Sequence, residues 1–391
     1  MATDDRWVRD EVERLVAYPT VSNRPVTALA AHVAQRAEDL GFSVERFDVS
    51  ADKGSVIASI GPEDSEGGLV LSGHLDVVPT ENQPWTSDPF RVVERDGKLF
   101  GRGTADMKGF VAATCAGLAR IAAHAYRRRL VLIWTHDEEI GCLGSAAIAD
   151  AMAGRPFPRA CWIGEPTEFR IQRMHPGHVA AEIEIGGRAA HSSRPDLGSN
   201  AIEGLTDVLR VGRDLARELA TRHQSDLPEI ERPWVVLNLA EVHGGTAINV
   251  VPDKVVLKLG YRPLPGHPAG AVFDELMGRI RALSLPYPID GRLLRSTPAM
   301  LTPAGTPLQH ALGAHADHPE CGAATFATDG GNLARLGMSP LVFGPGSITV
   351  AHQADEFVPV ADLVRTVDVV EQTVRRWCVD DDRPQPAQVN P

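Results

Sequence analysis

The chain has 391 residues, of which 43% are hydrophobic and 23% charged, and its formal net charge is −12. This composition is typical of a folded globular protein, and the length favours two domains over a single core. The acidic balance and the dispersed basic residues argue against a nucleic-acid partner. No apolar run is long enough to cross a bilayer, and the acidic start "MATDDRWVRDEVERLV" does not resemble a secretory signal. The five cysteines are scattered and odd in number, which suits reduced thiols in a cytoplasmic protein.

The outer parts of the chain alternate predicted helices with apolar strands. Helices are expected at residues 7–17, 26–40 and 104–124, and strands at 41–49, 69–78, 130–139, 160–166 and 339–347. Strands that alternate with helices are typical of an α/β fold with a mostly parallel sheet. In such sheets the ligand binds beyond the carboxyl ends of the strands, where several acidic residues fall in this sequence.

The middle of the chain follows a different pattern, in which apolar and polar residues alternate as in half-exposed antiparallel strands. The order is strand, helix, two strands and helix, at residues 178–191, 200–223, 234–245, 249–265 and 269–283. We interpret residues 177–289 as an inserted α+β (ferredoxin-like) domain. The outer domain is then discontinuous and comprises residues 1–176 and 290–391.

Histidines and acidic residues lie at or just after the predicted strand ends, beside glycines or turn residues. They are His74, Asp76, Asp106, Glu138, Glu139, Glu165 and His352. Imidazole nitrogens and carboxylate oxygens are the ligands that zinc and similar divalent ions accept. Each residue also has a structural alternative: Asp106 could cap the following helix, Glu165 could simply end a strand, and Glu138 and Glu139 could form a solvated turn. The shared residue types and positions favour a metal centre.

Eight ordered motifs carry a resemblance to a known family. They are "SGHLDVVP", "GRGTADMKG", "DEEIG", "IGEPT", "AAHSSRPDLGSNAI", "INVVPD", "YRPLPG" and "FGPGSITVAHQADE", between about residues 70 and 360. This series resembles the dinuclear zinc aminoacylase and carboxypeptidase family, and within it most closely the N-acetylornithine deacetylases. Succinyl-diaminopimelate desuccinylase is another similar member.

The resemblance assigns metal ligands by position. It implies that His74 and Glu165 bind one divalent ion and that Glu139 and His352 bind the other. Asp106 would bridge two zinc ions, with cobalt as an alternative metal. The family also has a cis peptide after the bridging aspartate, here Asp106–Met107.

The resemblance also implies catalytic roles for Glu138 and Asp76. Glu138 would be the general base, which passes a proton from water to the leaving amine. Asp76, two residues after His74, would hold the imidazole of His74 in one tautomer.

The inserted domain is implied to act as a lid and to form a homodimer. From it, His191 would polarise the scissile carbonyl in the partner subunit, and Asn249 and Arg262 would bind substrate. Arginine suits the carboxylate that every substrate of this family carries. Thr328, Gly330 and Gly331, in "ATDGGN", would line the other side of the pocket. This motif is neither the Thr-Glu-Ala of acetylornithine deacetylases nor the Asp-Gly-Arg of desuccinylases, which leaves the preferred side chain open.

The function that follows is hydrolysis of an N-acyl amino acid, with N-acetylornithine as the favoured substrate and arginine biosynthesis as the pathway. Acetylcitrulline, succinyl-diaminopimelate and dipeptide or carboxypeptidase substrates remain alternatives within the enzyme class. A catalytically inactive relative that binds an amino-acid derivative is the alternative outside it. No nucleic-acid or membrane partner is expected.

Overall fold

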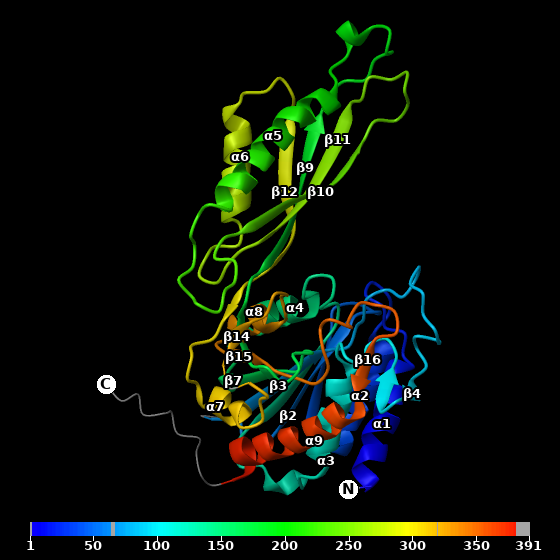
Figure 1. Cartoon of the computed structure of the whole chain (residues 1–391), viewed down its shortest axis with the longest axis vertical. Coiled ribbons are helices and arrows are strands. Elements are labelled where there is room, and N and C mark those ends of the chain that lie inside the picture. The colour runs from blue at the N-terminus through cyan, green and yellow to red at the C-terminus, as the bar shows by residue number, and fades with distance from the viewer. Residues whose placement is uncertain (1, 64–66, 319, 381–391) are drawn as a thin grey trace, which may run out of the picture. The chain divides into compact units, whose positions relative to one another are not determined.

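The computed structural model describes residues 2–63, 67–318 and 320–380 (Figure 1). Contacts within the chain divide it into two units. Unit 1 comprises the described parts of Met1–Met174, Leu301–Ala324 and Thr328–Pro391, and unit 2 comprises His175–Met300 with Thr325–Ala327. The predicted end of the insertion, at residue 289, therefore falls eleven residues before the end of the main segment of unit 2, at Met300.

The main sheet has a parallel centre and antiparallel edges, as expected for the α/β fold class. Its order is β1-β2-β6-β3-β7-β15-β8-β13, with β14 beside β8. The neighbours β6, β3, β7 and β15 pair in parallel. β1 pairs antiparallel with β2, β2 with β6, and β8 with β15, whereas β14 pairs parallel with β8. The strand bounds are β1 Ser43–Asp48, β2 Gly54–Ile60, β3 Leu69–His74, β6 Leu130–Thr135, β7 Ala160–Ile163, β8 Gln172–His175, β13 Met300–Leu301, β14 Gly322–Ala323 and β15 Ser339–Val342.

Helices cover both faces of this sheet, which explains why β3 and β6 are buried along their whole length. Figure 1 shows α1, α2, α3 and α9 on one face and α4 and α8 on the other. The bounds are α1 Ala2–Val16, α2 Thr27–Asp39, α3 Lys108–Ala119, α4 Leu143–Ala151, α7 Pro307–Gly313, α8 Gly330–Ala334 and α9 Val360–Val374. A small antiparallel sheet is formed by β4 Val93–Arg95, β5 Lys98–Phe100 and β16 Phe357–Pro359.

Unit 2 is an antiparallel sheet of order β10-β11-β9-β12 packed against two helices. Its elements are β9 His178–Gly186, α5 Ala201–Leu219, β10 Val236–Gly244, β11 Lys254–Arg262, α6 Ala271–Ala282 and β12 Ile289–Thr297. Alternate residues of β9, from Val179 to Ile185, are buried against the helices, as the period of two predicts. This β-α-β-β-α-β order with strand order 10-11-9-12 is ferredoxin-like, in agreement with the fold predicted for the insertion.

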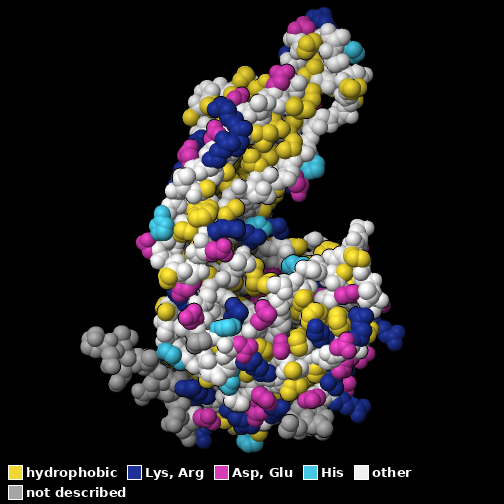
Figure 2. All heavy atoms as spheres, in the orientation of Figure 1, with side chains coloured by type: hydrophobic (Ala, Val, Ile, Leu, Met, Phe, Trp, Pro, Cys, Tyr) yellow, Lys and Arg dark blue, Asp and Glu magenta, His cyan; other side chains and the backbone are white. Residues whose placement is uncertain are grey.

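Charged side chains of both signs are interspersed over the face of unit 1 that Figure 2 draws. None of the helices in the described part of the chain is both long and apolar enough to cross a membrane.

Candidate metal centre

The centre of the site is built on three adjacent parallel strands. β3 ends at His74, β6 ends at Thr135 just before Glu138 and Glu139, and β7 ends two residues before Glu165. Because β6, β3 and β7 are neighbours in this order, their carboxyl ends meet at one edge of the sheet. Two further residues reach the same place from loops: Asp106 precedes α3, and His352 lies between β15 and β16.

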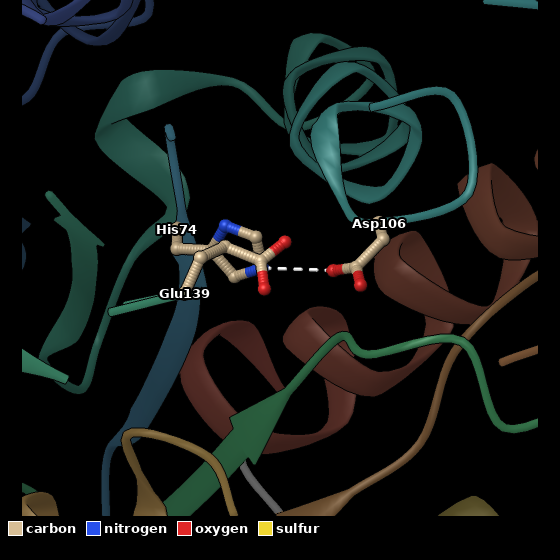
Figure 3. A group of neighbouring side chains, drawn as sticks. All are labelled: His74, Asp106 and Glu139. Carbon is tan, nitrogen blue, oxygen red and sulfur yellow. Dashed lines mark hydrogen bonds and ion pairs between the residues drawn. The ribbon is translucent and has the colours of Figure 1, made fainter. Parts of the chain in front are cut away.

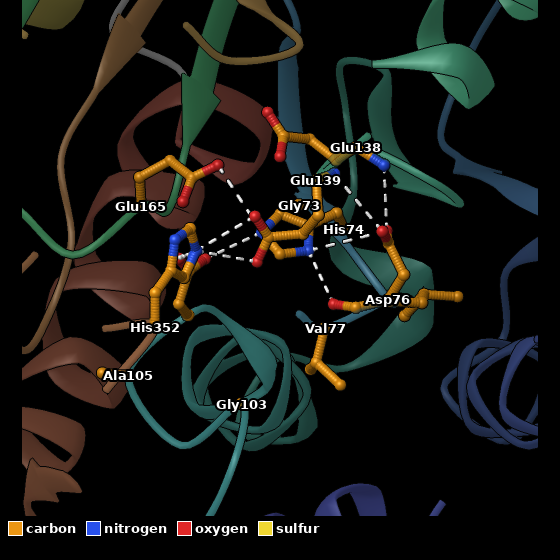
Figure 4. Close-up of polar contacts among 12 residues, drawn as sticks. Gly73, His74, Asp76, Val77, Gly103, Ala105, Glu138, Glu139, Glu165 and His352 are labelled. Carbon is orange, nitrogen blue, oxygen red and sulfur yellow. Dashed lines mark hydrogen bonds and ion pairs between the residues drawn. The ribbon is translucent and has the colours of Figure 1, made fainter. Parts of the chain in front are cut away.

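The five residues predicted to bind metal lie together: Figure 3 shows Asp106 facing His74 and Glu139, and Figure 4 shows His74, Glu139, Glu165 and His352. Asp106 Oδ1 lies 2.8 Å from Nε2 of His74, and Asp106 Oδ2 lies 3.2 Å from Nε2 of His352. Glu139 Oε2 lies 3.0 Å from the same nitrogen of His352, and Glu165 Oε1 lies 3.8 Å from Nε2 of His74. Each oxygen of Asp106 therefore faces a different histidine, and each histidine has a second carboxylate nearby.

The N-cap alternative for Asp106 is not supported. The N-cap residue of α3 is Met107, and no side chain makes a capping hydrogen bond there. The Asp106–Met107 peptide bond is cis, as expected.

Burial and nearby negative charge raise the pKa values of two of the three carboxyl groups, Glu139 and Glu165. Burial, and then the neighbouring Asp106 carboxylate, raise the pKa of Glu165 well above its usual range and that of Glu139 to about 7. Burial would also raise the pKa of Asp106, but the hydrogen bonds with His352 and His74 outweigh it and lower the pKa.

The histidines show the complementary effect. Hydrogen bonds to Asp106 and Glu139 raise the pKa of His352 to about 10. Burial would lower the pKa of His74, but Glu165 and Asp106 outweigh burial and raise it. The clustered carboxylates therefore favour the protonated form of both histidines. Two imidazoles and three carboxylates that face a common centre are a donor set that fits divalent ions of the zinc type.

Asp76 contacts the site differently from the sequence-based expectation. Nδ1 of His74 lies 2.9 Å from the backbone carbonyl oxygen of Asp76, whereas the Asp76 carboxylate is 3.8 Å away. The carboxylate instead accepts hydrogen bonds from the backbone N–H groups of Glu138, at 3.0 Å, and Glu139, at 3.3 Å, and from the hydroxyl of Ser22, at 2.8 Å. Asp76 thus holds His74 through its main chain and the two glutamates through its side chain.

Glu138 belongs to a second cluster, with Cys142 and Asp329, that the sequence did not reveal. The thiol of Cys142 donates to Glu138 Oε1 at 3.3 Å, and oxygens of Glu138 and Asp329 and the Cys142 sulfur lie within 4.8 Å of one another. Burial is the largest cause of the raised pKa of Glu138, and the charge of Glu165 adds to it. Cys142 comes four residues after Glu138, and its N–H donates to the carbonyl oxygen of Glu138 at 2.8 Å, so the turn before α4 brings the two residues together. No local pattern points to Asp329.

The remaining predicted residues divide between the two units. Thr328 is buried in unit 1 and accepts a hydrogen bond from the N–H of Gly330, at 3.1 Å, and Gly330 and Gly331 form the first turn of α8. In unit 2, His191 is exposed and forms an isolated antiparallel β-bridge with Val250, the residue after Asn249.

Arg262 ends β11 and lines a hollow of about 500 Å³ on unit 2, together with His178 and Arg295. Burial and the neighbouring Arg295 lower the pKa of Arg262.

Comparison with known proteins connects this geometry to a family. The model of peptidase family M20/M25/M40 matches residues 70–376. An acetylornithine deacetylase of Myxococcus xanthus is 35% identical over 385 residues, covering 95% of this chain and 97% of the relative. Another, from Vibrio campbellii (strain ATCC BAA-1116), is 35% identical over 353 residues, covering 87% and 89%.

Solved structures share the fold at low sequence identity. An M20 family metallo-carboxypeptidase from Sulfolobus solfataricus has a TM-score of 0.76 at 15% identity and covers 94% of this chain and 98% of its own. A dinuclear metal-binding peptidase of the M20 family from Bacillus subtilis has a TM-score of 0.66 at 14% identity, with 96% and 99% covered. The chain is a metal-dependent amidohydrolase, and it belongs to peptidase family M20/M25/M40.

Proposed function

We propose that this chain is an N-acetylornithine deacetylase, which hydrolyses N2-acetyl-L-ornithine to L-ornithine and acetate. The observation that carries the proposal is the position of Asp106, whose two carboxylate oxygens face His74 and His352. The two relatives that are 35% identical over most of the chain support the choice of substrate. We place the enzyme in the cytoplasm and in arginine biosynthesis.

Two divalent ions would be held by the five clustered residues. His74 and Glu165 would bind the first, Glu139 and His352 the second, and Asp106 both. We assign zinc, with cobalt as an alternative, because imidazole and carboxylate ligands suit these ions. Bound there, the ions would polarise the scissile carbonyl and lower the pKa of a water molecule.

Glu138 would move the proton that the reaction requires. It would accept a proton from the attacking water and deliver it to the departing nitrogen. Burial raises the pKa of Glu138, so its carboxylate accepts a proton more readily than that of an exposed glutamate. Asp76 would fix the backbone of Glu138 through its 3.0 Å hydrogen bond.

Residues of unit 2 would bind and polarise the substrate. Arg262 would pair with the substrate carboxylate, and Asn249 would contribute a further hydrogen bond. His191, from the partner subunit of a homodimer, would stabilise the oxyanion. In unit 1, the backbone at Thr328, Gly330 and Gly331 would line the pocket. The resemblance supports each of these roles.

A substrate panel tests the proposal. The zinc-loaded protein should have its highest kcat/KM on N2-acetylornithine among acetylated, succinylated and peptidyl substrates. A higher kcat/KM on acetylcitrulline, succinyl-diaminopimelate or a dipeptide would reassign the substrate. Absence of turnover on the whole panel, with both metals bound, would favour the inactive binding relative. Glu138→Ala supplies the control, because it should lose turnover and keep its metals.

A further inference from the structure

Two of the five clustered residues, Asp106 and His352, come from loops and not from strand ends. His352 is the less enclosed of the two, because its side chain is 49% exposed and that of Asp106 only 7%. Its backbone also adopts a left-handed conformation, with φ of 63°, which residues other than glycine seldom adopt. The position of its imidazole therefore depends on what holds its main chain.

A chain of polar side chains connects the backbones of these two residues. Gln83 donates from Nε2 to the carbonyl oxygen of His352, at 3.0 Å. Arg102 donates from Nη2 to Oε1 of Gln83, at 2.7 Å, and from Nη1 to Oε2 of Glu356, at 2.6 Å. Oε1 of Glu356 accepts hydrogen bonds from the backbone N–H groups of Gly103, at 3.0 Å, Ala105, at 2.9 Å, and Asp106, at 3.1 Å.

The surroundings hold this chain of contacts in place. Arg102 and Glu356 are 1% and 0% exposed, so their ion pair is shielded from solvent. Trp85 lies under the guanidinium of Arg102, 5.1 Å from ring centroid to Cζ, and its Nε1–H donates to Gln83 Oε1 at 3.1 Å. The Gln83 amide therefore has both its oxygen and its nitrogen engaged, which fixes its orientation.

We propose that Gln83, Arg102 and Glu356 are positioning residues that preorganise Asp106 and His352 for metal binding. None of the three is placed to bind a metal itself; they act through the main chain of the residues that do. The inference rests on the proposed function, because it requires the two-metal centre described above. Loss of Gln83 and loss of Glu356 should affect metal binding differently. Gln83 holds only His352, whereas Glu356 holds Asp106, the residue shared by both metal sites.

Binding of Zn²⁺ to the metal-free full-length chain tests this by isothermal titration calorimetry in competition with a chelator. Gln83→Leu should weaken the second equivalent of Zn²⁺ by about 10–100-fold, the usual effect of losing a group that orients a ligand, and leave the first within about twofold. Glu356→Gln should weaken both equivalents by about tenfold or more. His352→Ala is the reference for loss of the second site. Gln35→Leu is the matched control, because Gln35 is exposed and its amide donates to Asp39, at 3.1 Å, far from the metal ligands in sequence.

The outcomes separate this inference from the proposed function. Wild-type protein that takes up fewer than two equivalents of Zn²⁺ overturns the two-metal centre and the inference with it. The inference alone is overturned if the wild-type protein binds two equivalents of Zn²⁺ but the Gln83→Leu variant does not weaken the second one selectively. That is the case if the variant has the dissociation constants of the wild type, or if both equivalents are weakened equally. Gln83 is only half-buried, so its variant should fold, and thermal denaturation of the metal-free protein checks this. If that variant melts early, Arg102→Gln must still weaken the second equivalent, or the inference is wrong.

Discussion

Replacing Asp76 by asparagine would test how the two adjacent glutamates are held at the metal centre. The carboxylate of Asp76 accepts the N–H of Glu138 on one oxygen and the N–H of Glu139 on the other. Asparagine has the same size but only one acceptor oxygen, so its amide nitrogen would face one of the two N–H groups. The buried variant therefore loses one charge-assisted hydrogen bond and leaves one donor unsatisfied.

The expected cost follows from these two losses. A hydrogen bond to a charged group contributes about 1.5–3 kcal/mol, and an unsatisfied buried N–H costs about 1–3 kcal/mol. Because Asp76 is only 1% exposed, solvent cannot replace the lost partner. We expect Asp76→Asn to lower the free energy of unfolding of the metal-free protein by roughly 3 kcal/mol. Displacement of Glu138 should also lower kcat by at least tenfold.

Guanidinium chloride unfolding of the metal-free proteins measures the free energy of unfolding, and steady-state kinetics of the zinc-loaded proteins measures kcat. Asp368→Asn is the matched control, because Asp368 pairs with Arg120 but its side chain is 52% exposed, so the change should stay within about 0.5 kcal/mol. An Asp76→Asn variant that unfolds like wild type and keeps its kcat would show that the carboxylate does not hold the glutamates.

Three further predictions concern the proton carrier, the ligand cluster and the metals. Glu138→Gln should lower kcat by about 10²–10⁴-fold while the protein still binds two equivalents of Zn²⁺, measured by elemental analysis; loss of the metals would instead make Glu138 a ligand. The pKa of Glu139 is raised to about 7 by burial, so its contribution to the stability of the metal-free protein is fully present below its unfolded value near 4.5 and is lost as pH rises to 7. Unfolding measured across this pH range should show a decrease of up to about 3 kcal/mol that Glu139→Gln removes, and an unchanged slope in that variant would contradict the assignment. Chelation should lower the melting temperature, and free Zn²⁺ at about 100 times the dissociation constant of a site should restore about 2.7 kcal/mol for that site; identical melting with and without metal would contradict a metal centre.

The sequence predicted the strand-borne part of the site because the relevant signals are local. β3 is a short apolar run that ends in His74, and the apolar strands β6 and β7 are followed by Glu139 within four residues and by Glu165 within two, so strand and site residue occur in one motif. The parallel arrangement then requires their carboxyl ends to meet. His74, Glu139 and Glu165 could therefore be grouped without coordinates.

Other features have no local signal. The last strand of unit 2, β12, was not predicted, because a glycine at position 291 and a register shift between Leu293 and Arg295 interrupt its alternating pattern. The contact of Asp329 with the cluster around Glu138 joins residues 191 positions apart, and the role of the Asp76 main chain cannot be read from the identity of its side chain.

Whether a metal-binding residue lies on a strand or in a loop determines which interactions hold it in place. His74, the last residue of β3, is positioned by the hydrogen-bond ladder of the sheet, which does not depend on particular side chains, whereas Glu165 and Glu139 follow β7 and β6 by two and four residues. Asp106, Glu139 and His352 lie outside the hydrogen-bond ladder of the sheet, so side chains hold their main chain instead. Asp76 accepts the N–H of Glu139, Gln83 donates to the carbonyl of His352, and Glu356 accepts the N–H of Asp106. Substitutions in the sheet should then reach the metals only through global stability. Substitutions in residues 83–103 should instead change metal affinity without altering any ligand.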